Sequence, residues 1–333
     1  MERFAVVILN WNASADTIQC LRSIFIADPT AVPVVVDNGS QDDSVRQILF
    51  WCQSLGIRTA TGSAEDLCAT RTEQPPRQLL LVRSRDNLGF AKGSNLGLRV
   101  VAALEFPSTV FLNNDTVVAP GALSFLVDKL RVEPELYAAV PQLRISGTDQ
   151  IWNCGGTISR LGYRRYHFGG RKLTSTSLPK RIVCSFFTGC CFAVRTREFC
   201  ARGGFSERFF FGEEDFELAL WMLDNGKTAA CFTDAVIDHK VSASISKSGR
   251  ARSSTIYLYY LNRLIHMRLR FGVWRWRVWL CLYLPYIIQL LYRTSRLSTA
   301  DLLRFVTRLV RDARRYDGVT HELFTQIMRT QSW

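Results

Sequence analysis

Short apolar runs rich in β-branched residues alternate with helical patterns in the N-terminal part of the chain. Phe4 to Leu9 and Val32 to Val36 are two such runs, and a stretch with helical spacing of apolar side chains separates them. Residues 78–82 and 109–112 form two more runs, and a second helical pattern follows Ser40. Strands that alternate with helices predict a parallel sheet, because parallel neighbours need a crossover connection. We therefore expect an α/β fold with ligands at the carboxyl ends of its strands.

The distribution of charge divides the chain after His239. The 333 residues include 42 Lys or Arg and 29 Asp or Glu, a formal net charge of +13. Residues 1–240 carry 26 basic and 25 acidic side chains, whereas residues 241–333 carry 16 and 4. This pattern predicts a nearly neutral domain over 1–240 and a basic, aromatic-rich helical region over 241–333. A polyanion or an anionic membrane would meet the second region.

The start of the chain and its cysteines indicate a compartment. MERFAVVILNWN lacks a basic segment followed by a long apolar run and a cleavage site, so we expect a cytoplasmic protein. The 10 cysteines show neither paired zinc-type spacing nor a dense disulfide framework. They are therefore expected to be reduced and mostly buried.

Polar residues follow four of the predicted strands. They are Asn10 with Asn12, residues 37–40, residues 113–115, and Asp238 with His239. Any one group could be a helix cap or a turn, whereas four groups at strand ends favour ligand contacts. An amide and a carboxylate two residues apart, at Asn113 and Asp115, suit a hard divalent cation shared with phosphate oxygens, and His239 could add a ligand. The alternatives are a cap for Asp115 and a satisfied loop histidine for His239.

Two further segments have a composition that suits chemistry. Residues 85–95 combine two glycines, a lysine and amides between a strand and a helix, and could hold a diphosphate. Lys92 precedes its glycine and GxGxxG is absent, so kinase, NTPase and nicotinamide-binding functions lose support. Residues 213–217 place four carboxylates at a helix start, where negative charge is favoured. Aromatic residues 209–211 precede them, and a carboxylate beside aromatic side chains has a raised pKa. One of these carboxylates could therefore serve as a general base instead.

The ordered set of segments resembles the family 2 glycosyltransferases with the GT-A fold, and within them the bacterial rhamnosyltransferase-like branch. The stretches that carry the resemblance lie within residues 5–240 and are VVILNWN, VVVDNGSQDDS, RDNLGFAKGSN, VFLNNDTVV, FTGCCFAVRTREFCARGGFSERFFFGEEDFEL and DAVIDHK. The resemblance implies a Rossmann-like, mostly parallel central sheet flanked by helices. It also implies an inverting, metal-dependent hexosyltransferase that moves a sugar from dTDP-rhamnose or a UDP-sugar to a glycan hydroxyl in bacterial surface polysaccharide synthesis.

The same resemblance implies roles for individual residues. Asp37 would hold the base or ribose of the nucleotide. The other donor contacts would be Asn10, Asn87, Gly89, Lys92, Asn95 and Asn114. Asp115 would be the main ligand of Mg²⁺ or Mn²⁺, with His239 and with Asn113, which stands where the family has an acid. Asp215 would be the catalytic base, and Glu214 and Glu217 would lie on the acceptor side.

The basic region contains two distinct helical patterns. Val278 to Tyr292 is apolar except for Gln289, is interrupted by Pro285 and is too short to span a bilayer. Residues 302–315 place apolar and arginine side chains on opposite helix faces. We expect this basic amphipathic helix to lie on the anionic inner face of the cell membrane, close to a polyprenyl-linked acceptor. Alternatively, these helices pack on the body or on a second subunit of a homo-oligomer; nucleic acid is not expected.

Two other functional classes remain open at this point. One is a non-catalytic nucleotide-sugar-binding or scaffold protein that keeps the fold. The other is a nucleotidyltransferase on a similar sheet, which would carry a glycine-rich basic loop where this chain has NWNAS.

Overall fold

The computed structural model describes residues 2–69, 77–240, 249–294 and 298–329. These residues group into two compact units. The first unit comprises Met1–Ser206 and Leu218–Val241, and the second comprises Glu207–Glu217 and Ser242–Trp333. The segment Glu207–Glu217, which the charge pattern assigns to the neutral domain, thus groups with the C-terminal helices.

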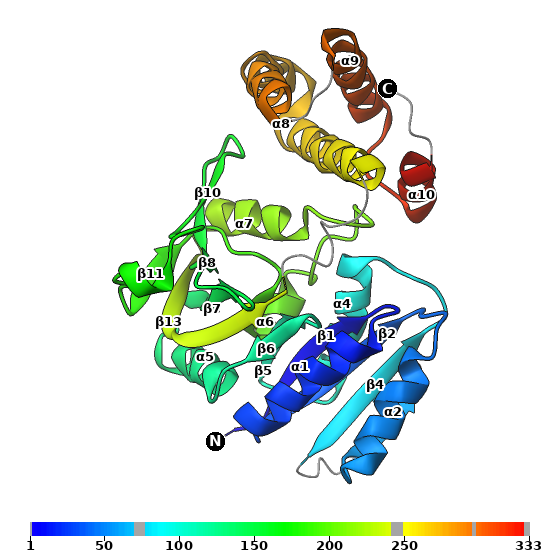
Figure 1. Ribbon diagram of the computed structural model, residues 1–333, viewed down its shortest axis with the longest axis vertical. Helices are drawn as coiled ribbons and strands as arrows, with labels where there is room; N and C mark the ends of the chain where they lie inside the picture. The colour runs from blue at the N-terminus through cyan, green and yellow to red at the C-terminus, as the bar shows by residue number, and fades with distance from the viewer. Residues whose placement is uncertain (1, 70–76, 241–248, 295–297, 330–333) are drawn as a thin grey trace. The chain divides into compact units, whose positions relative to one another are not determined.

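Within the described part of the first unit, eleven strands form one sheet (Figure 1). Across the sheet its main path runs β11 (Arg181–Cys184), β13 (Thr228–His239), β7 (Leu136–Ile145), β12 (Cys191–Arg195), β5 (Ser108–Asn113), β1 (Phe4–Asn10), β2 (Ala31–Asn38), β4 (Gln78–Ser84) and β3 (Arg58–Gly62). Two short strands join this path at its side, β6 (Thr116–Val118) on β13 and β8 (Ile151–Asn153) on β7. A separate pair is formed by β9 (Gly156–Ile158) and β10 (Arg164–Tyr166).

Most strands run in the same direction. β1 pairs in parallel with β2 and β5, β4 pairs in parallel with β2 and β3, and β7 pairs in parallel with β13. β12 is antiparallel to both β5 and β7, so β7 and β13 have the same direction as β5. Asn10, Asn38, Asn113 and His239 therefore end their strands at one edge of the sheet. The predicted α/β fold with a mostly parallel sheet is confirmed.

Helices cover both faces of this sheet. One face packs against α1 (Ser14–Ala27), α2 (Ser44–Ser54) and α5 (Ala122–Val132). The other packs against α3 (Ala64–Ala69), α4 (Phe90–Ala103), α6 (Thr196–Ala201) and residues 218–222 of α7 (Glu214–Asp224). Because helices bury both faces, β1 and β2 consist of continuous apolar runs and not of alternating ones.

Two glycines allow α4 to approach the sheet closely. A Cβ on Gly93 would lie 2.6 Å from Cδ2 of Leu9, and a Cβ on Gly97 would lie 2.7 Å from Cγ1 of Val7. Any larger residue would push α4 away from β1. Since Gly89 and Phe90 form the start of α4, this packing sets the position of the loop at the carboxyl edge.

The sequence between Gly56 and Arg77 lacks periodicity and predicts a surface insertion, which is wrong for its first part. Residues 58–62 form the edge strand β3, and residues 64–69 form α3. The strand was not recognised because an edge strand with one solvated side buries few apolar residues. Residues 70–76 of this stretch lie outside the described residues.

The second unit contains three C-terminal helices, α8 (Gly249–Thr294), α9 (Thr299–Arg315) and α10 (His321–Arg329). Gly272 has φ 72°, so α8 is two helices joined at a kink. Pro285, which interrupts the apolar run of the sequence, lies inside this helix. None of the helices in the described ranges has the length and apolar content that a membrane span requires.

The predicted basic amphipathic helix forms, as α9. Its apolar face is buried at Leu302, Phe305 and Leu309. Tyr257 of α8 contacts this face: its ring lies 5.3 Å from that of Phe305, and its hydroxyl donates a 2.7 Å hydrogen bond to Asp312 Oδ2. The prediction that this apolar face meets a lipid surface is therefore wrong, since α8 covers it.

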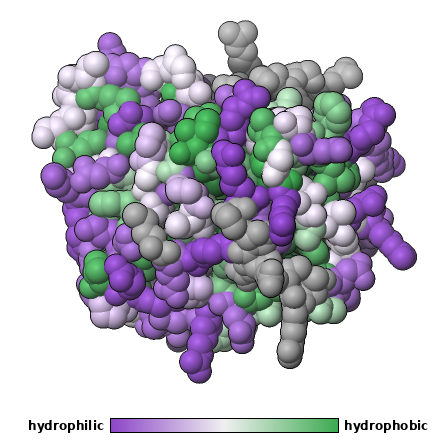
Figure 2. Space-filling model, turned by 90° about the horizontal axis from the view of Figure 1, so that it is seen from below, coloured by the Kyte–Doolittle hydropathy of each residue, from purple (hydrophilic) through white to green (hydrophobic). Residues whose placement is uncertain are grey.

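Figure 2 shows one face of the molecule coloured by hydropathy. Hydrophilic side chains occupy most of that face, and apolar side chains are scattered among them. Scattered apolar residues of this kind are ordinary for a protein surface.

Candidate active site

A chain of hydrogen-bonded side chains lies at the carboxyl edge of the sheet in the first unit. Asn114 Nδ2 donates to Thr17 Oγ1 (3.0 Å), Thr17 Oγ1 donates to Asn10 Oδ1 (2.7 Å), and Asn10 Nδ2 donates to Asp37 Oδ1 (2.9 Å). Asn10 and Asp37 are also neighbours in the register of β1 and β2. The network thus joins the turn after β5 to α1, β1 and β2 and fixes the orientation of each side chain.

The Asp37 carboxylate is buried but fully partnered. Its Oδ1 accepts from Asn10, and its Oδ2 accepts from the backbone N–H of Ser40 at 3.3 Å. Ser40 also accepts from Asn10 Nδ2 at 3.1 Å. A buried carboxylate is tolerated only with such donors, so this cluster holds the loop after β2 in one conformation.

Asn38, a member of the polar group 37–40, organises the facing loop, a role that the sequence did not indicate. Its Nδ2 donates to Asn87 Oδ1 and to the Gly89 carbonyl, each at 3.1 Å, and its Oδ1 accepts from Leu88 N at 3.0 Å. Asn87 Oδ1 also accepts from Gly89 N at 2.9 Å. The loop that the sequence predicts to contact the donor is therefore held to the end of β2.

Gly39 makes this approach of the two loops possible. Its φ is +73°, and a Cβ at this position would lie 2.4 Å from the carbonyl carbon of Asp86. Only glycine combines that backbone conformation with the space available.

The remaining predicted donor contacts have different environments. Lys92 is exposed on the first turn of α4, where its charge is available to an anion. Asn95 instead bonds to backbone: its Nδ2 donates to the Phe205 carbonyl and its Oδ1 accepts from Phe205 N, each at 2.8 Å. The structure thus gives Asn95 a role in holding the loop at Phe205.

Asp115 and His239, the predicted metal ligands, lie together. His239 Nε2 is 3.0 Å from Asp115 Oδ1, and both side chains are largely buried. The ends of β6 and β13 bring them close, because Thr116 pairs with His239. Trp152 of β8 packs on the imidazole with ring centroids 4.6 Å apart, a contact that sequence reasoning missed.

These residues suit a divalent cation whose coordination a ligand completes. His239 Nδ1 is buried and has no hydrogen-bond partner among the described residues, so the ring is not fixed by a second acceptor. Mn²⁺ and Mg²⁺ both accept a carboxylate, Mn²⁺ accepts an imidazole more readily than the harder Mg²⁺ does, and phosphate oxygens could supply further ligands. In the described ranges, no group of three or more His, Cys, Asp or Glu side chains could hold an ion by itself.

Neighbouring groups limit the choice of further protein ligands. Asn114 Nδ2 donates to Thr17, and this hydrogen bond orients the Asn114 amide. Burial raises the pKa of the nearby Cys20 thiol to about 12, so this sulfur stays protonated at neutral pH.

The carboxylates of residues 213–217 belong to the second unit. Glu214, Asp215 and Glu217 lie in the first turn of α7 and are half-buried, whereas Glu213 is buried just before it. Glu213 has φ 73°, which is strained for a residue with a side chain. Its carbonyl accepts the 2.8 Å hydrogen bond from Glu217 N that begins the helix.

Arg263 of α8 holds Glu213 in this conformation. Arg263 Nε lies 3.1 and 3.0 Å from the two carboxylate oxygens, and Nη2 lies 2.9 Å from Oε1. The guanidinium carbon is 3.4 Å from the centre of the Phe216 ring. Burial by itself would lower the pKa of Arg263, but the Glu213 carboxylate outweighs it and raises this pKa. No pattern in the sequence indicates this pair, because its two members are fifty residues apart.

Further contacts anchor the rest of the segment within the second unit. Asn262 Nδ2 donates to the Phe211 carbonyl at 2.8 Å, and Phe210 N donates to the Val319 carbonyl at 2.8 Å. His266 packs against Phe209 and Phe216, with ring centroids 6.3 and 5.3 Å away. The C-terminal helices therefore fix the backbone that carries Asp215.

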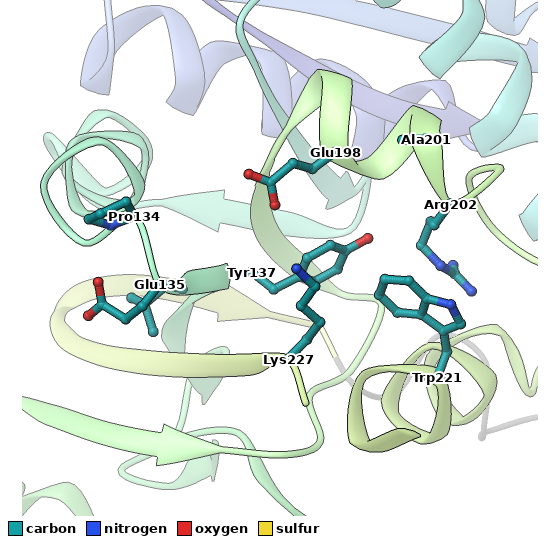
Figure 3. A pocket seen from close by; sticks show the side chains of 9 residues that line it. Pro134, Glu135, Tyr137, Glu198, Ala201, Arg202, Trp221 and Lys227 are labelled. Atoms are coloured by element: carbon teal, nitrogen blue, oxygen red, sulfur yellow. The ribbon is translucent and has the colours of Figure 1, made fainter. Parts of the chain in front are cut away.

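A separate pocket of about 350 Å³ lies where β7 and β13 begin, at the opposite edge of the sheet (Figure 3). Tyr137 and Trp221 line it with ring centroids 5.2 Å apart, and the Arg202 guanidinium lies 4.8 Å from the Trp221 ring. The described residues that line it do not include the predicted donor and metal ligands. The candidate site is therefore the polar carboxyl edge and not this pocket.

Solved structures that resemble the chain include a mannosyltransferase and GalNAc-T7. The mannosyltransferase PcManGT from Pyrobaculum calidifontis, in complex with GDP-Man and Mn²⁺, matches 98% of this chain and 85% of its own, with a TM-score of 0.55 and 16% identity. GalNAc-T7 with UDP, GalNAc and Mn²⁺ matches 79% of this chain, with a TM-score of 0.54 and 13% identity, and the match covers 51% of GalNAc-T7, about half its length. No protein-family model and no curated protein sequence matches. The likeness lies in the fold, and by its mostly parallel sheet and flanking helices the chain has the fold of the GT-A glycosyltransferases.

Proposed function

We propose that the protein is a metal-dependent glycosyltransferase that moves a sugar from a nucleotide-sugar donor to a hydroxyl group of an acceptor glycan. The observation that carries the proposal is the Asp115–His239 pair at the same sheet edge as the Asn10–Asp37 network. The GT-A fold supports it, and the similar structures PcManGT and GalNAc-T7 contain GDP-Man and UDP, respectively, together with Mn²⁺.

In this proposal, the first unit binds the donor. Asn10 and Asp37 form a rigid base to the nucleotide site, and the loop from Asn87 to Gly89 is held beside them by Asn38. Lys92 contributes positive charge to a diphosphate from the exposed first turn of α4. Residues 1–240 carry 26 basic and 25 acidic side chains, so local donors and not a large net charge must recognise the anion.

Asp115, His239 and Asn113 would hold Mg²⁺ or Mn²⁺. When bound, the cation neutralises charge that develops on the departing diphosphate. Asp115 and His239 approach from β6 and β13 and are largely buried, which keeps the carboxylate and imidazole oriented. Asn113 and Asn114 complete the turn that presents Asp115.

Asp215 is our proposed general base. It would remove the proton from the acceptor hydroxyl as that oxygen attacks the anomeric carbon, and a single base without a protein nucleophile inverts the configuration. Glu214 and Glu217 would contact the acceptor. The resemblance to family 2 glycosyltransferases supports these roles, and the anchoring of Glu213 by Arg263 supports a defined position for the start of α7.

The finer proposals concern donor, acceptor and place. The rhamnosyltransferase-like segments favour dTDP-rhamnose or a UDP-sugar as donor and a lipid-linked glycan of bacterial surface polysaccharide as acceptor. The 16 basic and 4 acidic residues of 241–333 support a peripheral position on the anionic inner face of the cell membrane.

A comparison of two carboxylate variants tests the proposed activity. Asp215→Asn should abolish transfer and keep donor binding, because a general base contributes about 10²–10⁴ to the rate. Glu217→Gln in the same helix turn is the matched control and should keep measurable transfer. Release of nucleoside diphosphate and glycosylated product are followed by mass spectrometry, and donor binding is followed by thermal shift with Mn²⁺. Full transfer by Asp215→Asn would refute the assignment, and donor binding without turnover by the wild type would identify a non-catalytic binding protein.

A further inference from the structure

The second half of α8 exposes a continuous apolar face. Trp274, Val278, Leu282 and Tyr292 are 77%, 68%, 62% and 68% exposed. Trp274, Val278 and Leu282 follow one another at intervals of four, and Tyr292 lies about five turns after Trp274, so all of these positions lie on one side of the helix. Other exposed members of the face are Cys281, Pro285 and Ile288, and the one polar residue is Gln289.

This exposure is not a consequence of a poorly packed helix. The opposite side of α8 is buried at Trp276, Trp279, Tyr283, Ile287 and Leu291. Trp276 Nε1 donates to the Leu264 carbonyl at 3.0 Å, and the Trp279 and Tyr283 rings stack at 4.2 Å. The helix is therefore fixed within its unit while its outer face stays apolar. An apolar strip from Trp274 to Tyr292 is about 27 Å long at 1.5 Å per residue, and such patches mark an interaction surface.

The charges around the strip indicate what covers it. α8 contains no acidic residue, and exposed arginines lie at both ends of the strip, Arg275 and Arg277 at one end and Arg293 at the other. The Arg277 guanidinium lies 4.9 Å from the Trp274 ring. A second copy of the same face would place arginines against arginines, which is unfavourable, whereas an anionic surface complements them.

We propose that residues 273–293 of α8 lie in the headgroup layer of an anionic membrane, with the exposed apolar face toward the acyl chains. Trp274, Tyr286 and Tyr292 occupy the interface, where aromatic side chains are favoured, and the arginines contact lipid phosphates. The membrane contact itself is inferred from α8 alone. Its biological role, which is to bring the enzyme to a lipid-linked acceptor, rests on the proposed function. It assigns lipid contact to α8 and not to α9, whose apolar face is buried.

Vesicle co-sedimentation of the full-length protein tests this surface. We use phosphatidylcholine vesicles with and without phosphatidylglycerol and compare the wild type with Val278→Ser/Leu282→Ser. The matched control is Val132→Ser/Leu161→Ser, which makes the same change at exposed apolar positions of the first unit. Thermal shift with the nucleotide-sugar checks that every variant is folded and binds donor. Removal of two inserted side chains should weaken binding to the anionic vesicles about tenfold or more, and the control should bind like the wild type.

Several outcomes would overturn the inference. Equal vesicle binding by wild type and Val278→Ser/Leu282→Ser would place lipid contact elsewhere. Absence of vesicle binding by the wild type would exclude a membrane surface, and a stable dimer in light scattering that this double variant dissociates would assign the face to a second copy. Transfer to a soluble acceptor is measured in parallel, so that failure of the membrane inference and failure of the proposed enzyme activity are separate results.

Discussion

Replacement of Arg263 by methionine tests how the chain holds the segment that carries Asp215. Methionine keeps an unbranched apolar side chain against Phe216 but removes the hydrogen bonds to Glu213. The Arg263 and Glu213 side chains are each only 2% exposed, so the variant leaves a buried carboxylate without its counter-charge. Such a loss typically destabilises a protein by about 3–5 kcal/mol.

The strained backbone adds to this effect. Glu213 has φ 73°, a conformation that costs a non-glycine residue about 1–2 kcal/mol and that the ion pair offsets. Without Arg263, Glu213 is expected to relax, and the first turn of α7 with it. We therefore expect Arg263→Met to lower kcat strongly and to change the KM for the donor little, because the donor residues belong to the first unit.

Hydrogen exchange and a double-mutant cycle measure the prediction. Protection of the backbone amides of residues 207–217 and of α8 should fall in Arg263→Met. The double variant Arg263→Met/Glu213→Gln should recover much of the lost protection and stability, because replacing both members of a buried ion pair often changes stability little. Arg304→Met is the control, because the Arg304 side chain is 69% exposed and its ion pair contributes little. The reasoning is refuted if Arg263→Met keeps wild-type protection and kcat, or if the double variant is as unstable as Arg263→Met.

Three further results follow from the structure. Burial lowers the pKa of His266 to about 4. The charge of Glu217 raises this pKa, and the charges of Arg263, Arg270 and Arg208 lower it further. Between pH 4 and 6.5 the unfolded chain therefore binds a proton that the folded unit does not. Unfolding free energy of the second unit should therefore fall by about 1–3 kcal/mol as pH drops from 6.5 to 4, and His266→Phe should remove this slope in urea titrations; an unchanged slope contradicts it. Gly39→Ala should lower the unfolding free energy of the first unit by more than about 2 kcal/mol and weaken donor binding. The control Gly56→Ala has a similar φ and nothing within 4 Å of its Cβ, so it should lower the unfolding free energy by only about 1 kcal/mol. Equal losses in thermal unfolding would contradict the close approach of Gly39 to Asp86. Asn10→Ala should lower the unfolding free energy by about 1–3 kcal/mol, because it removes the residue that bonds to both Asp37 and Thr17. It should also raise the dissociation constant for the nucleotide-sugar, measured by calorimetry. Unchanged binding would show that this network is not part of the donor site.

The apolar runs of β1 and β2 made the parallel sheet predictable, because strands buried on both faces need continuous apolar sequence. The polar residues at the ends of β1, β5 and β13 made the carboxyl edge of the sheet predictable as the candidate site. The structure brings Asp115 and His239 together at this edge. Edge strand β3 was missed because its burial is slight.

Side-chain networks were less accessible from sequence. Thr17 and Asn38 have side chains that occur in many helices and turns, and only the fold shows that they join Asn10 to Asn114 and hold the loop at Gly89. Arg263 is fifty residues from Glu213, so no local pattern could indicate their contact. The covered face of α9 was mistaken for a lipid contact because periodicity shows that a face is apolar but not what buries it.

The most direct measurement is the rate of nucleoside diphosphate release from a nucleotide-sugar by the wild type and Asp115→Asn, each with Mn²⁺ and with EDTA. We predict Mn²⁺-dependent release by the wild type, little release in EDTA, and a rate for Asp115→Asn that Mn²⁺ barely changes. Metal-independent release by the wild type, or full Mn²⁺-dependent release by Asp115→Asn, would contradict a metal-dependent glycosyltransferase centred on Asp115 and His239.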